Sequence, residues 1–327
     1  MDRIALITGI TGMAGSHLAE YLLTQDYKIF GLVRRSSTDN LWRIKKILGN
    51  IELVNGDITD QSSLDRAINL IRPDEVYNLC AQSFVSDSWK TPESTFDINA
   101  LGVLRLLEAI RNFGNKNIKV FQSSSSEQFG RVLETPQTEE TSPYPRSPYG
   151  ISKLAGYWII KNWRESYNVF ASNAISFNYT SYRRGLEFVE RKISLGVAKI
   201  YLGLTDYIEL GNLDAKRDWG WAEEYVTYFH KILQLDEPDD FVLATGKTHS
   251  VREFLELAFQ YFEISDWQKY VKQNPKFMRP VEVDYLCGNA TKAKEKLGFE
   301  PKKKFKDIVY EMCKSDIERL QRGDRIE

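Results

Sequence analysis

The chain has 327 residues and a mass of 37.9 kDa, and hydrophobic residues make up 42% of it, which is enough material for two lobes that share one cleft. Lys and Arg together number 44 against 45 for Asp and Glu, so the formal charge is -1. This balance argues against a protein that binds nucleic acid through bulk positive charge.

Cysteine and histidine usage predicts neither a disulfide framework nor a metal site. The three cysteines and the three histidines are scattered and share no close spacing. The apolar run at the amino terminus is too short for a secretory signal, and no stretch of about 18 apolar residues, the length a membrane span needs, occurs in the sequence. We therefore expect a cytoplasmic protein without a metal site and with no membrane or nucleic-acid partner.

Short apolar runs alternate with amphipathic segments through roughly residue 180. The runs that we interpret as strands are residues 4–8, 28–33, 51–54, 75–79, 119–122 and 170–177. Strands that alternate with helices imply right-handed crossovers and a parallel sheet covered on both faces. The sequence thus predicts an α/β fold with a Rossmann-like doubly wound parallel sheet, whose ligands bind beyond the carboxyl ends of the strands.

Beyond residue 180 the alternation of strands and helices is replaced by shorter helices and irregular segments rich in aromatic and charged residues. One more strand is expected at residues 241–244. We predict a first domain over residues 1–180, which can recruit later segments such as residues 211–245. A smaller, mostly helical substrate lobe is expected over residues 181–327. The lysine-rich stretch PKKKFKD, which starts at residue 301, is interpreted as a solvated helix face.

A glycine-rich turn follows the first predicted strand directly. Gly9, Gly12 and Gly15 have the spacing G-x-x-G-x-x-G and open a helix at residues 16–23. Glycines at such a turn let backbone N–H groups approach a pyrophosphate at the positive end of a helix. The alternative is a turn that only needs small residues. In its context the turn predicts a dinucleotide site.

The second predicted strand ends in Arg34, Arg35 and Ser36, where proteins that prefer NAD have an acidic residue on the ribose hydroxyls. Guanidinium groups form forked, charge-assisted hydrogen bonds to phosphate. This end of the strand therefore favours the ribose 2′-phosphate of NADP, with a solvated basic turn as the alternative. Asp57 and Ile58, after the third strand, are placed to meet the adenine.

Tyr149 and Lys153 begin a helix after a proline-rich approach. One helical turn separates them, so they share a face. A nearby ammonium favours the tyrosinate, and we expect it to lower the phenol's pKa from about 10 towards the working pH. Tyr149 then exchanges a proton with a substrate hydroxyl as hydride moves to a nicotinamide. The pattern is common by chance and needs support from other residues.

That support comes from the run SSSSEQFG, which follows the fifth predicted strand at the edge where substrate is expected. Ser125 precedes Tyr149 by 24 residues (149 minus 125) and is placed to hydrogen-bond the hydroxyl or carbonyl that is interconverted. Glu127 is placed to remove the acidic proton beside a newly formed ketone. The alternative for Glu127 is a solvated loop carboxylate.

These stretches together resemble the extended short-chain dehydrogenase/reductase superfamily and, within it, the GDP-mannose 4,6-dehydratases. The resemblance spans nearly the whole chain and is carried by GITGMAGSHLAEYLL, GLVRRSS, SSSSEQFG, SPYGISK, LGNLDAKRDWG and RPVEVDYLCGNATKAKEKLGF. It implies a cycle in which NADP+ takes hydride from carbon 4 of a GDP-sugar. A glutamate then removes the proton on carbon 5 as water leaves carbon 6, and hydride returns to carbon 6.

The residue patterns and the resemblance together give three sets of candidate residues. The catalytic set is Ser125, Ser126, Glu127, Tyr149 and Lys153. The set expected to hold NADP, mostly in the first domain, is Gly9, Thr11, Gly12, Met13, Gly15, Arg34, Arg35, Ser36, Asp57, Ile58, Leu79, Ala81, Ser83, Tyr149, Lys153 and Arg184. The set expected to hold the GDP-sugar is Ser83, Ser88, Ser125, Glu127, Asn178, Val189, Lys192, Gly211, Asn212, Arg217, Arg279 and Glu282.

Three stretches depart from the family pattern. Met13 and Ala14 replace Gln-Asp, residues 179–182 (Tyr-Thr-Ser-Tyr) replace His-Glu-Ser-Pro, and Trp221 replaces a histidine. We expect the second and third departures to cluster around the sugar pocket or its lid, which leaves the sugar open. Two alternatives therefore stay open: a GDP-sugar 4-dehydrogenase, epimerase or 4-keto reductase of the same superfamily, and a non-catalytic NADP-binding protein.

The resemblance also implies self-association. Relatives are dimers or tetramers whose dimer contact is made by the helices around residues 101–113 and 149–163. We expect a homodimer or a homotetramer.

Overall fold

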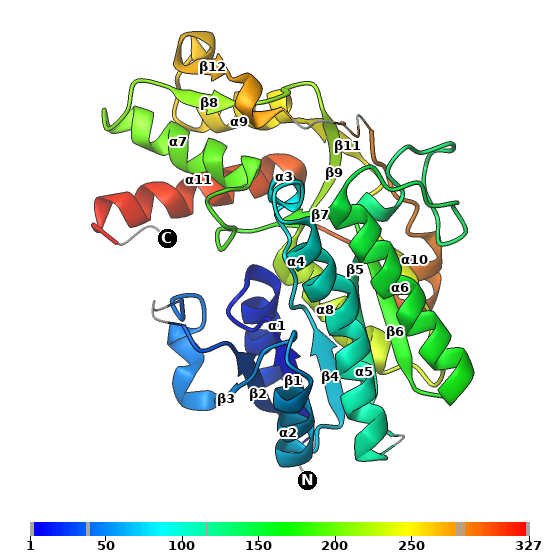
Figure 1. Cartoon of the computed structure of the whole chain (residues 1–327). Coiled ribbons are helices and arrows are strands. Elements are labelled where there is room, and N and C mark those ends of the chain that lie inside the picture. Colours follow the sequence, from blue (N-terminus) through cyan, green and yellow to red (C-terminus); the bar gives the residue numbers. More distant parts are fainter. Residues whose placement is uncertain are drawn as a thin grey trace.

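The computed structural model describes residues 3–36, 40–115, 117–278, 281, 283 and 285–324, and the statements below concern these residues. Its centre is a seven-stranded sheet with the order β10-β6-β5-β4-β1-β2-β3 and parallel pairing throughout (Figure 1). The strands are β1 (Ile4–Thr8), β2 (Lys28–Val33), β3 (Glu52–Asn55), β4 (Glu75–Asn78), β5 (Lys119–Ser125), β6 (Ala171–Ser176) and β10 (Phe241–Leu243).

Helices cover both faces of this sheet, as the alternating pattern predicts. Helices α1 (Met13–Leu23) and α8 (Ala222–Leu233) pack on one face through one apolar cluster. Helices α2 (Gln61–Ile71), α5 (Gly102–Phe113) and α6 (Pro148–Tyr167) pack on the other face through a second cluster. The predicted doubly wound α/β fold is confirmed. Among the helices described, none has the length and apolar composition of a membrane span.

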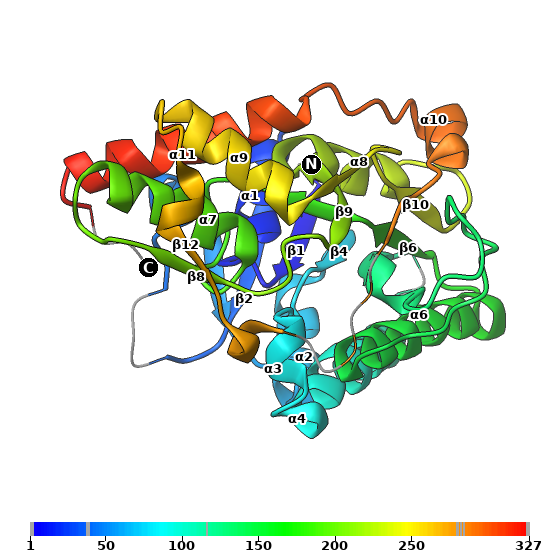
Figure 2. The ribbon, with the colours of Figure 1, turned by 90° about the horizontal axis from the view of Figure 1, so that it is seen from above.

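A second lobe stands above the carboxyl ends of the strands (Figures 1 and 2). Its apolar cluster joins three helices, α7 (Val189–Tyr201), α9 (Val251–Tyr261) and α11 (Phe305–Gln321). Two small sheets complete it, made of β7 (Asn178–Thr180), β9 (Lys216–Trp221) and β11 (Thr248–Ser250), and of β8 (Ile208–Leu210) and β12 (Val271–Gln273).

Shorter helical elements connect these parts of the fold. They are η1 (Lys45–Asn50), α3 (Val85–Ser88), α4 (Pro92–Phe96), η2 (Asp97–Leu101), η3 (Ser126–Gln128), η4 (Trp267–Tyr270), η5 (Pro275–Phe277) and α10 (Thr291–Leu297).

Two elements are longer than the sequence predicts. Strand β5 continues three residues past residue 122, because residues 123–125 pair with residues 174–176 of β6 although their side chains are polar. Helix α1 begins at Met13 rather than at residue 16, directly after Gly12 as its N-cap. Both extensions bring backbone nearer to the carboxyl edge of the sheet, where ligands bind in this type of fold.

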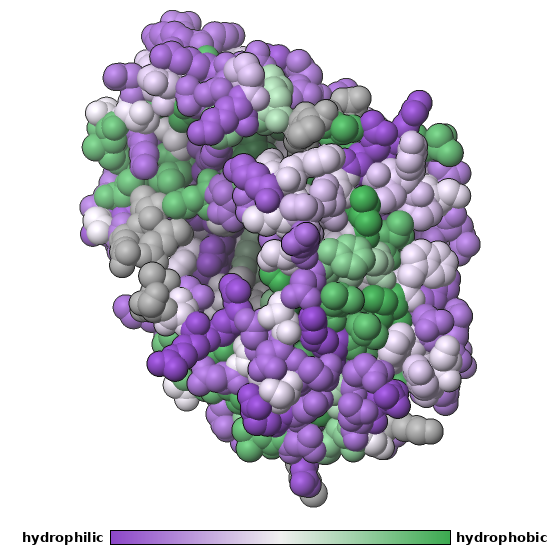
Figure 3. All heavy atoms as spheres, in the orientation of Figure 1, coloured by the Kyte–Doolittle hydropathy of each residue, from purple (hydrophilic) through white to green (hydrophobic). Residues whose placement is uncertain are grey.

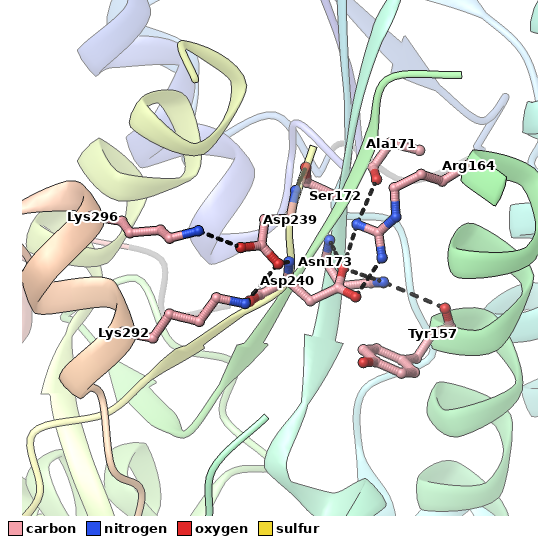
Figure 4. Close-up of polar contacts among 9 residues, drawn as sticks. All are labelled: Tyr157, Arg164, Ala171, Ser172, Asn173, Asp239, Asp240, Lys292 and Lys296. Carbon is pink, nitrogen blue, oxygen red and sulfur yellow. Dashed lines mark hydrogen bonds and ion pairs between the residues drawn. The ribbon is translucent and has the colours of Figure 1, made fainter. Parts of the chain in front are cut away.

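The chain returns to the main sheet at β10, and a buried carboxylate holds that strand in place (Figure 4). The Asp240 carboxylate pairs with Arg164 of α6 at 2.6 Å and accepts hydrogen bonds from the backbone and side-chain nitrogens of Asn173, both at 3.0 Å. Asp239 pairs with two lysines of α10. Elements from the second half of the sequence thus complete the sheet, and the domain boundary near residue 180 stays a prediction.

A fully buried ion pair joins α7 to α11. The Arg191 guanidinium lies 2.6 Å from the Asp316 carboxylate, which also accepts a hydrogen bond from the Ser194 hydroxyl at 2.6 Å. Burial raises the pKa of Asp316 and lowers that of Arg191. The pair therefore fixes the position of α7, the helix that carries two of the expected substrate residues.

We expect Asp316→Ala to lower the free energy of unfolding by about 3–5 kcal/mol, because it leaves a buried guanidinium unpaired. Urea unfolding followed by circular dichroism measures this. The control is Glu52→Gln, which removes the exposed pair between Lys28 and Glu52 and should cost less than about 1 kcal/mol. Equal losses in the two variants would contradict a structural role for Asp316.

Candidate active site

A cavity of about 1020 Å³ lies between the carboxyl ends of the main strands and the second lobe. Its floor includes the ends of β1 and β4, which are neighbours in the sheet although β4 follows β3 in the chain. The strand order reverses at this point, and such a switch point is where doubly wound sheets bind their ligands.

The glycine turn forms one wall of this cavity, and its glycines are required by close backbone contacts. Gly9 has a φ of +69°, and a Cβ atom on it would lie 2.9 Å from the backbone nitrogen of Cys80. A Cβ atom on Gly15 would lie 2.3 Å from the carbonyl oxygen of Gly9. The glycines therefore let the turn pack closely against its own backbone and the end of β4. The turn and the amino end of α1 line the cavity, and this position fits the diphosphate of a dinucleotide.

Most of the residues expected to hold the cofactor line the cavity. They are Gly9, Thr11, Gly12, Met13, Gly15, Arg34, Leu79, Ala81, Ser83, Tyr149, Lys153 and Arg184.

Four of the expected cofactor residues do not line the cavity. Arg35 and Ser36 follow β2 and are exposed. The Asp57 carboxylate accepts hydrogen bonds from the backbone nitrogen and hydroxyl of Thr59. Ile58 is buried in the core cluster beneath α2 and α5. An adenine contact by Asp57 or Ile58 thus rests on the sequence pattern alone.

Tyr149, Ser125 and Lys153 come together at the base of the cavity. Helix α6 starts at Pro148 with Ser147 as its N-cap, whose side chain accepts a hydrogen bond from the backbone nitrogen of Gly150. The Tyr149 phenol is hydrogen-bonded to the Ser125 side chain. The ammonium of Lys153 donates to the Ser123 carbonyl oxygen at 2.7 Å. The helix start thus delivers a phenol and an ammonium to the end of β5.

The protonation of this group differs from the sequence-based expectation. Burial raises the pKa of the Tyr149 phenol above its ordinary value, and the hydrogen bond to Ser125 opposes that rise only in part. Burial also lowers the pKa of Lys153 to about 8. The ammonium lies 5.9 Å from the centre of the phenol ring. Burial therefore acts against the tyrosinate, so the spacing of Tyr149 and Lys153 alone does not lower the pKa of the phenol.

Glu127 lies beside this group, in the one-turn helix η3 that follows β5. Its backbone nitrogen donates to the Ser125 hydroxyl oxygen at 3.3 Å, and its side chain lines the cavity with 9% of the residue exposed. Gly150 permits this approach, because a Cβ atom there would lie 2.6 Å from the Glu127 carbonyl oxygen. Ser126, next to it, also lines the cavity. A carboxylate and a phenol thus face one enclosed space.

The upper wall of the cavity belongs to the second lobe. The expected substrate residues that line the cavity are Ser83, Ser125, Glu127, Asn178, Val189, Lys192, Gly211, Asn212 and Arg217. The Lys192 ammonium lies 3.5 Å from the centre of the Phe277 ring. Arg217 donates to the Val283 carbonyl oxygen at 2.6 Å. Two basic side chains are therefore held at the wall opposite the sheet.

One expected substrate residue, Ser88, is not brought to the cavity. Ser88 is fully buried in α3, does not line the cavity, and donates its hydroxyl to the Val85 carbonyl oxygen at 2.6 Å. Its small polar side chain completes a local turn instead. Arg279 and Glu282 lie outside the described residues.

The structure corrects the expected place of two family departures. Of the run at residues 179–182, only Tyr179 lines the cavity, whereas the Ser181 hydroxyl bonds the buried His17 ring at 2.9 Å. Trp221 is 2% exposed and packs within the second lobe beside Tyr182. These substitutions therefore mostly repack the contact between α1 and the second lobe, because aromatic rings fill that space. Met13 and Ala14 do line the cavity.

Sequence reasoning missed several cavity residues, of which Phe277 and Glu190 are the most informative. Phe277 forms the wall beneath Lys192. Its carbonyl oxygen lies close to Gly211, because a Cβ atom on Gly211 would be only 2.5 Å from that oxygen. Nothing in the local pattern marks this residue. Glu190 accepts a hydrogen bond from the Trp219 ring nitrogen at 3.3 Å. It follows Val189 directly, so its position in the chain could have indicated it.

The fold and the cavity residues define a doubly wound α/β protein whose cavity lies at the switch point of its sheet. Two solved structures share the fold. RMD from Pseudomonas aeruginosa in complex with NADPH has a TM-score of 0.80 at 23% identity, covering 97% of this chain and 100% of that chain. A dTDP-glucose 4,6-dehydratase from Streptomyces venezuelae with NAD bound has a TM-score of 0.85 at 21% identity, covering 98% of each chain.

The family is shown by sequence. The sequence model described as GDP-mannose 4,6 dehydratase matches residues 6–312. The GDP-mannose 4,6 dehydratase of Drosophila melanogaster is 47% identical over 98% of this chain and 88% of its own length. That of Homo sapiens is 48% identical over 98% of this chain and 92% of its own length. The chain belongs to the GDP-mannose 4,6 dehydratase family.

Proposed function

We propose that the protein is a GDP-mannose 4,6-dehydratase, which converts the GDP-sugar to its 4-keto-6-deoxy form. One observation carries the proposal: Tyr149, Ser125 and Glu127 face a single cavity that the glycine turn also lines. A phenol beside a hydroxyl serves alcohol oxidation, and a nearby carboxylate adds the base that elimination requires. Family membership supports the same activity.

A nicotinamide bound at the glycine turn would supply the hydride chemistry at carbons 4 and 6 of the sugar. The chain's own residues move the protons. Tyr149 exchanges a proton with the hydroxyl on carbon 4, and Ser125 orients that oxygen while it changes from alcohol to ketone. Glu127 takes the proton from carbon 5, which the adjacent ketone makes acidic, and passes it to the hydroxyl on carbon 6, which leaves as water. A proton from solvent adds to carbon 5 as hydride returns to carbon 6, and the proton that Tyr149 took from the hydroxyl on carbon 4 is released to solvent. Lys153 holds the end of β5 through the Ser123 carbonyl.

The guanosine diphosphate half of the substrate is assigned to the second lobe. Lys192 and Arg217 line the upper wall, and their charges suit a diphosphate. Burial lowers the pKa of Lys192 from its ordinary value, so an anionic ligand beside it would also stabilise its charged form. Asn178 and Asn212 add amide groups for hydrogen bonds to the nucleotide.

The test of this function is direct. Purified protein is mixed with GDP-mannose, and NMR follows the appearance of a 4-keto-6-deoxy sugar. We expect that product to accumulate with loss of the signals of the hydroxymethyl group on carbon 6. A product that keeps the carbon 6 hydroxyl would support a dehydrogenase, epimerase or 4-keto reductase in its place. No reaction from protein loaded with cofactor would reject mannose as the sugar.

We also propose NADP as the cofactor, supported by Arg34 at the cavity and by the absence of an acidic side chain in the described residues directly after β2. Arg34→Ala should weaken NADP binding by about tenfold to hundredfold, the effect of one lost charge-assisted bond. NAD affinity should stay unchanged, because NAD lacks the 2′-phosphate. Calorimetric titration of both nucleotides measures this, with Arg66→Ala on α2 as control. Co-purification of NAD instead of NADP would contradict the assignment.

A homodimer is the assembly that the surface favours. Large apolar side chains are exposed along α4, η2 and α6, namely Phe96, Leu101, Ile151 and Trp158, and Figure 3 shows apolar residues gathered over this side of the molecule. Contiguous apolar surface of this kind marks protein contacts.

We also propose a cytoplasmic location, since the three cysteines are unpaired thiols, as is typical of reducing compartments.

A further inference from the structure

A second cavity, of about 730 Å³, shares one side chain with the first. Trp219 lines both cavities. The rest of the second cavity is built by the outer face of α9, by residues 245–249 and by the lysine-rich segment of residues 301–306. Helices α9 and α11 lie side by side there (Figure 2). The proposed reaction uses no residue of this cavity.

The lining of the second cavity is strongly basic. Five lysines contribute to it, Lys247, Lys302, Lys303, Lys304 and Lys306, against two carboxylates, Glu253 and Glu256. The Glu253 carboxylate is already engaged, because it accepts from the His249 ring at 2.8 Å and from the Ser250 backbone nitrogen. Among the described residues, no carboxylate pairs with Lys247, Lys302 or Lys304 in the way that Glu311 pairs with Lys303. The cavity therefore carries uncompensated positive charge.

A stack of three parallel aromatic rings runs along the wall between the two cavities. The Trp219 and Phe305 rings are 5.6 Å apart with an angle of 14° between their planes. The Phe305 and His249 rings are 3.9 Å apart with an angle of 3°. The His249 side chain lines the cavity and is 30% exposed, so part of it is open to a ligand. The same wall thus offers a stacking surface and a contact with the first cavity.

We propose that the second cavity binds a nucleoside phosphate, whose phosphates contact the lysines and whose base stacks on His249. Its occupancy changes the affinity of the first cavity through the Phe305 and Trp219 rings. Both chemical features of the ligand have a counterpart in the lining, because ammonium groups bind phosphate and aromatic side chains stack on bases. The lysine-rich stretch at residue 301 is then part of a binding site rather than a solvated helix face. This site does not depend on the proposed dehydratase activity.

The test is a calorimetric titration of the full chain with GDP at low ionic strength. We expect two binding events per chain in the wild type. In the double variant Lys302→Gln and Lys304→Gln the second event should weaken by about tenfold, the combined effect of two exposed charge contacts. The control variant, Lys294→Gln with Lys314→Gln, changes two exposed lysines outside the cavity and should keep both events. Thermal unfolding confirms that all variants fold.

Other outcomes decide the remaining points. If the first cavity did not bind GDP, the wild type would show only the binding event of the second cavity, and the double variant would weaken that event. Failure of the proposed function is thus distinguishable from failure of the second site. Equal binding of inorganic pyrophosphate at the second site would contradict the stacking of a base on His249. At one fixed concentration of GDP, the affinity for GDP-mannose should differ by about fivefold or more between the wild type and the double variant, because competition in the first cavity is the same in both. An unchanged isotherm in the double variant would overturn the site, and equal GDP-mannose affinities in the two proteins would overturn the coupling.

Discussion

Tyr149→Phe should lower kcat for GDP-mannose by about 10²- to 10⁴-fold, the usual contribution of a positioned proton-transfer group. The substitution removes one hydroxyl from a side chain that is 8% exposed, so packing at the start of α6 is kept. The glycine turn is untouched, and the nicotinamide cofactor should remain bound. Steady-state turnover followed by NMR measures the first effect, and chromatography of the nucleotide released on denaturation measures the second.

The matched control is Tyr157→Phe, on the same helix two turns further along. That phenol is also buried, does not line the cavity, and hydrogen-bonds Asp240. We expect a small loss of stability and an unchanged kcat. Full turnover by Tyr149→Phe would remove Tyr149 from the mechanism, and equal losses in the two variants would attribute the effect to packing of α6.

Glu127→Gln should separate oxidation from elimination. The amide has almost the same volume as the carboxylate but takes no proton, so the carbon 5 proton stays while the alcohol at carbon 4 is still oxidised through Tyr149. We expect dehydration to fall by about 10²- to 10⁴-fold. Reduced cofactor should accumulate in a single turnover, which ultraviolet absorbance detects.

Glu140→Gln is the control for that variant, because Glu140 is exposed and lies outside the cavity. It should dehydrate at the wild-type rate. Normal dehydration by Glu127→Gln would mean that another base operates. Loss of the oxidation step as well would show that Glu127 positions the substrate in addition to removing its proton.

The main sheet could be predicted from the sequence because its signals are local. Apolar runs separated by amphipathic helices mark buried parallel strands, and β1 and β2 have the predicted bounds. The end of β5 was missed because its last three residues, 123–125, are serines and carry no apolar pattern. They extend the strand through pairing with β6, which is a contact between distant segments. Those serines form the base of the cavity.

The sheet side of the site could be predicted from the sequence better than the side formed by the second lobe. The sheet side depends on spacing within short segments, such as the glycine turn and Tyr149 with Lys153, and the structure brings those residues together. The second lobe depends on long-range packing. The stack of Phe277 beneath Lys192 and the interior place of Trp221 have no local signal. Desolvation of Tyr149 is also a property of the folded cavity and is absent from the spacing alone.

The central claim is that one cavity oxidises carbon 4, eliminates water and reduces carbon 6 without releasing hydride. It is tested most directly with GDP-mannose that carries deuterium on carbon 4, turned over in ordinary water and analysed by NMR and mass spectrometry. The account predicts a 4-keto-6-deoxy product with the deuterium on carbon 6, and in heavy water a solvent deuterium on carbon 5. A 4-keto product that retains its carbon 6 hydroxyl, or a 6-deoxy product that has lost the label, would contradict it.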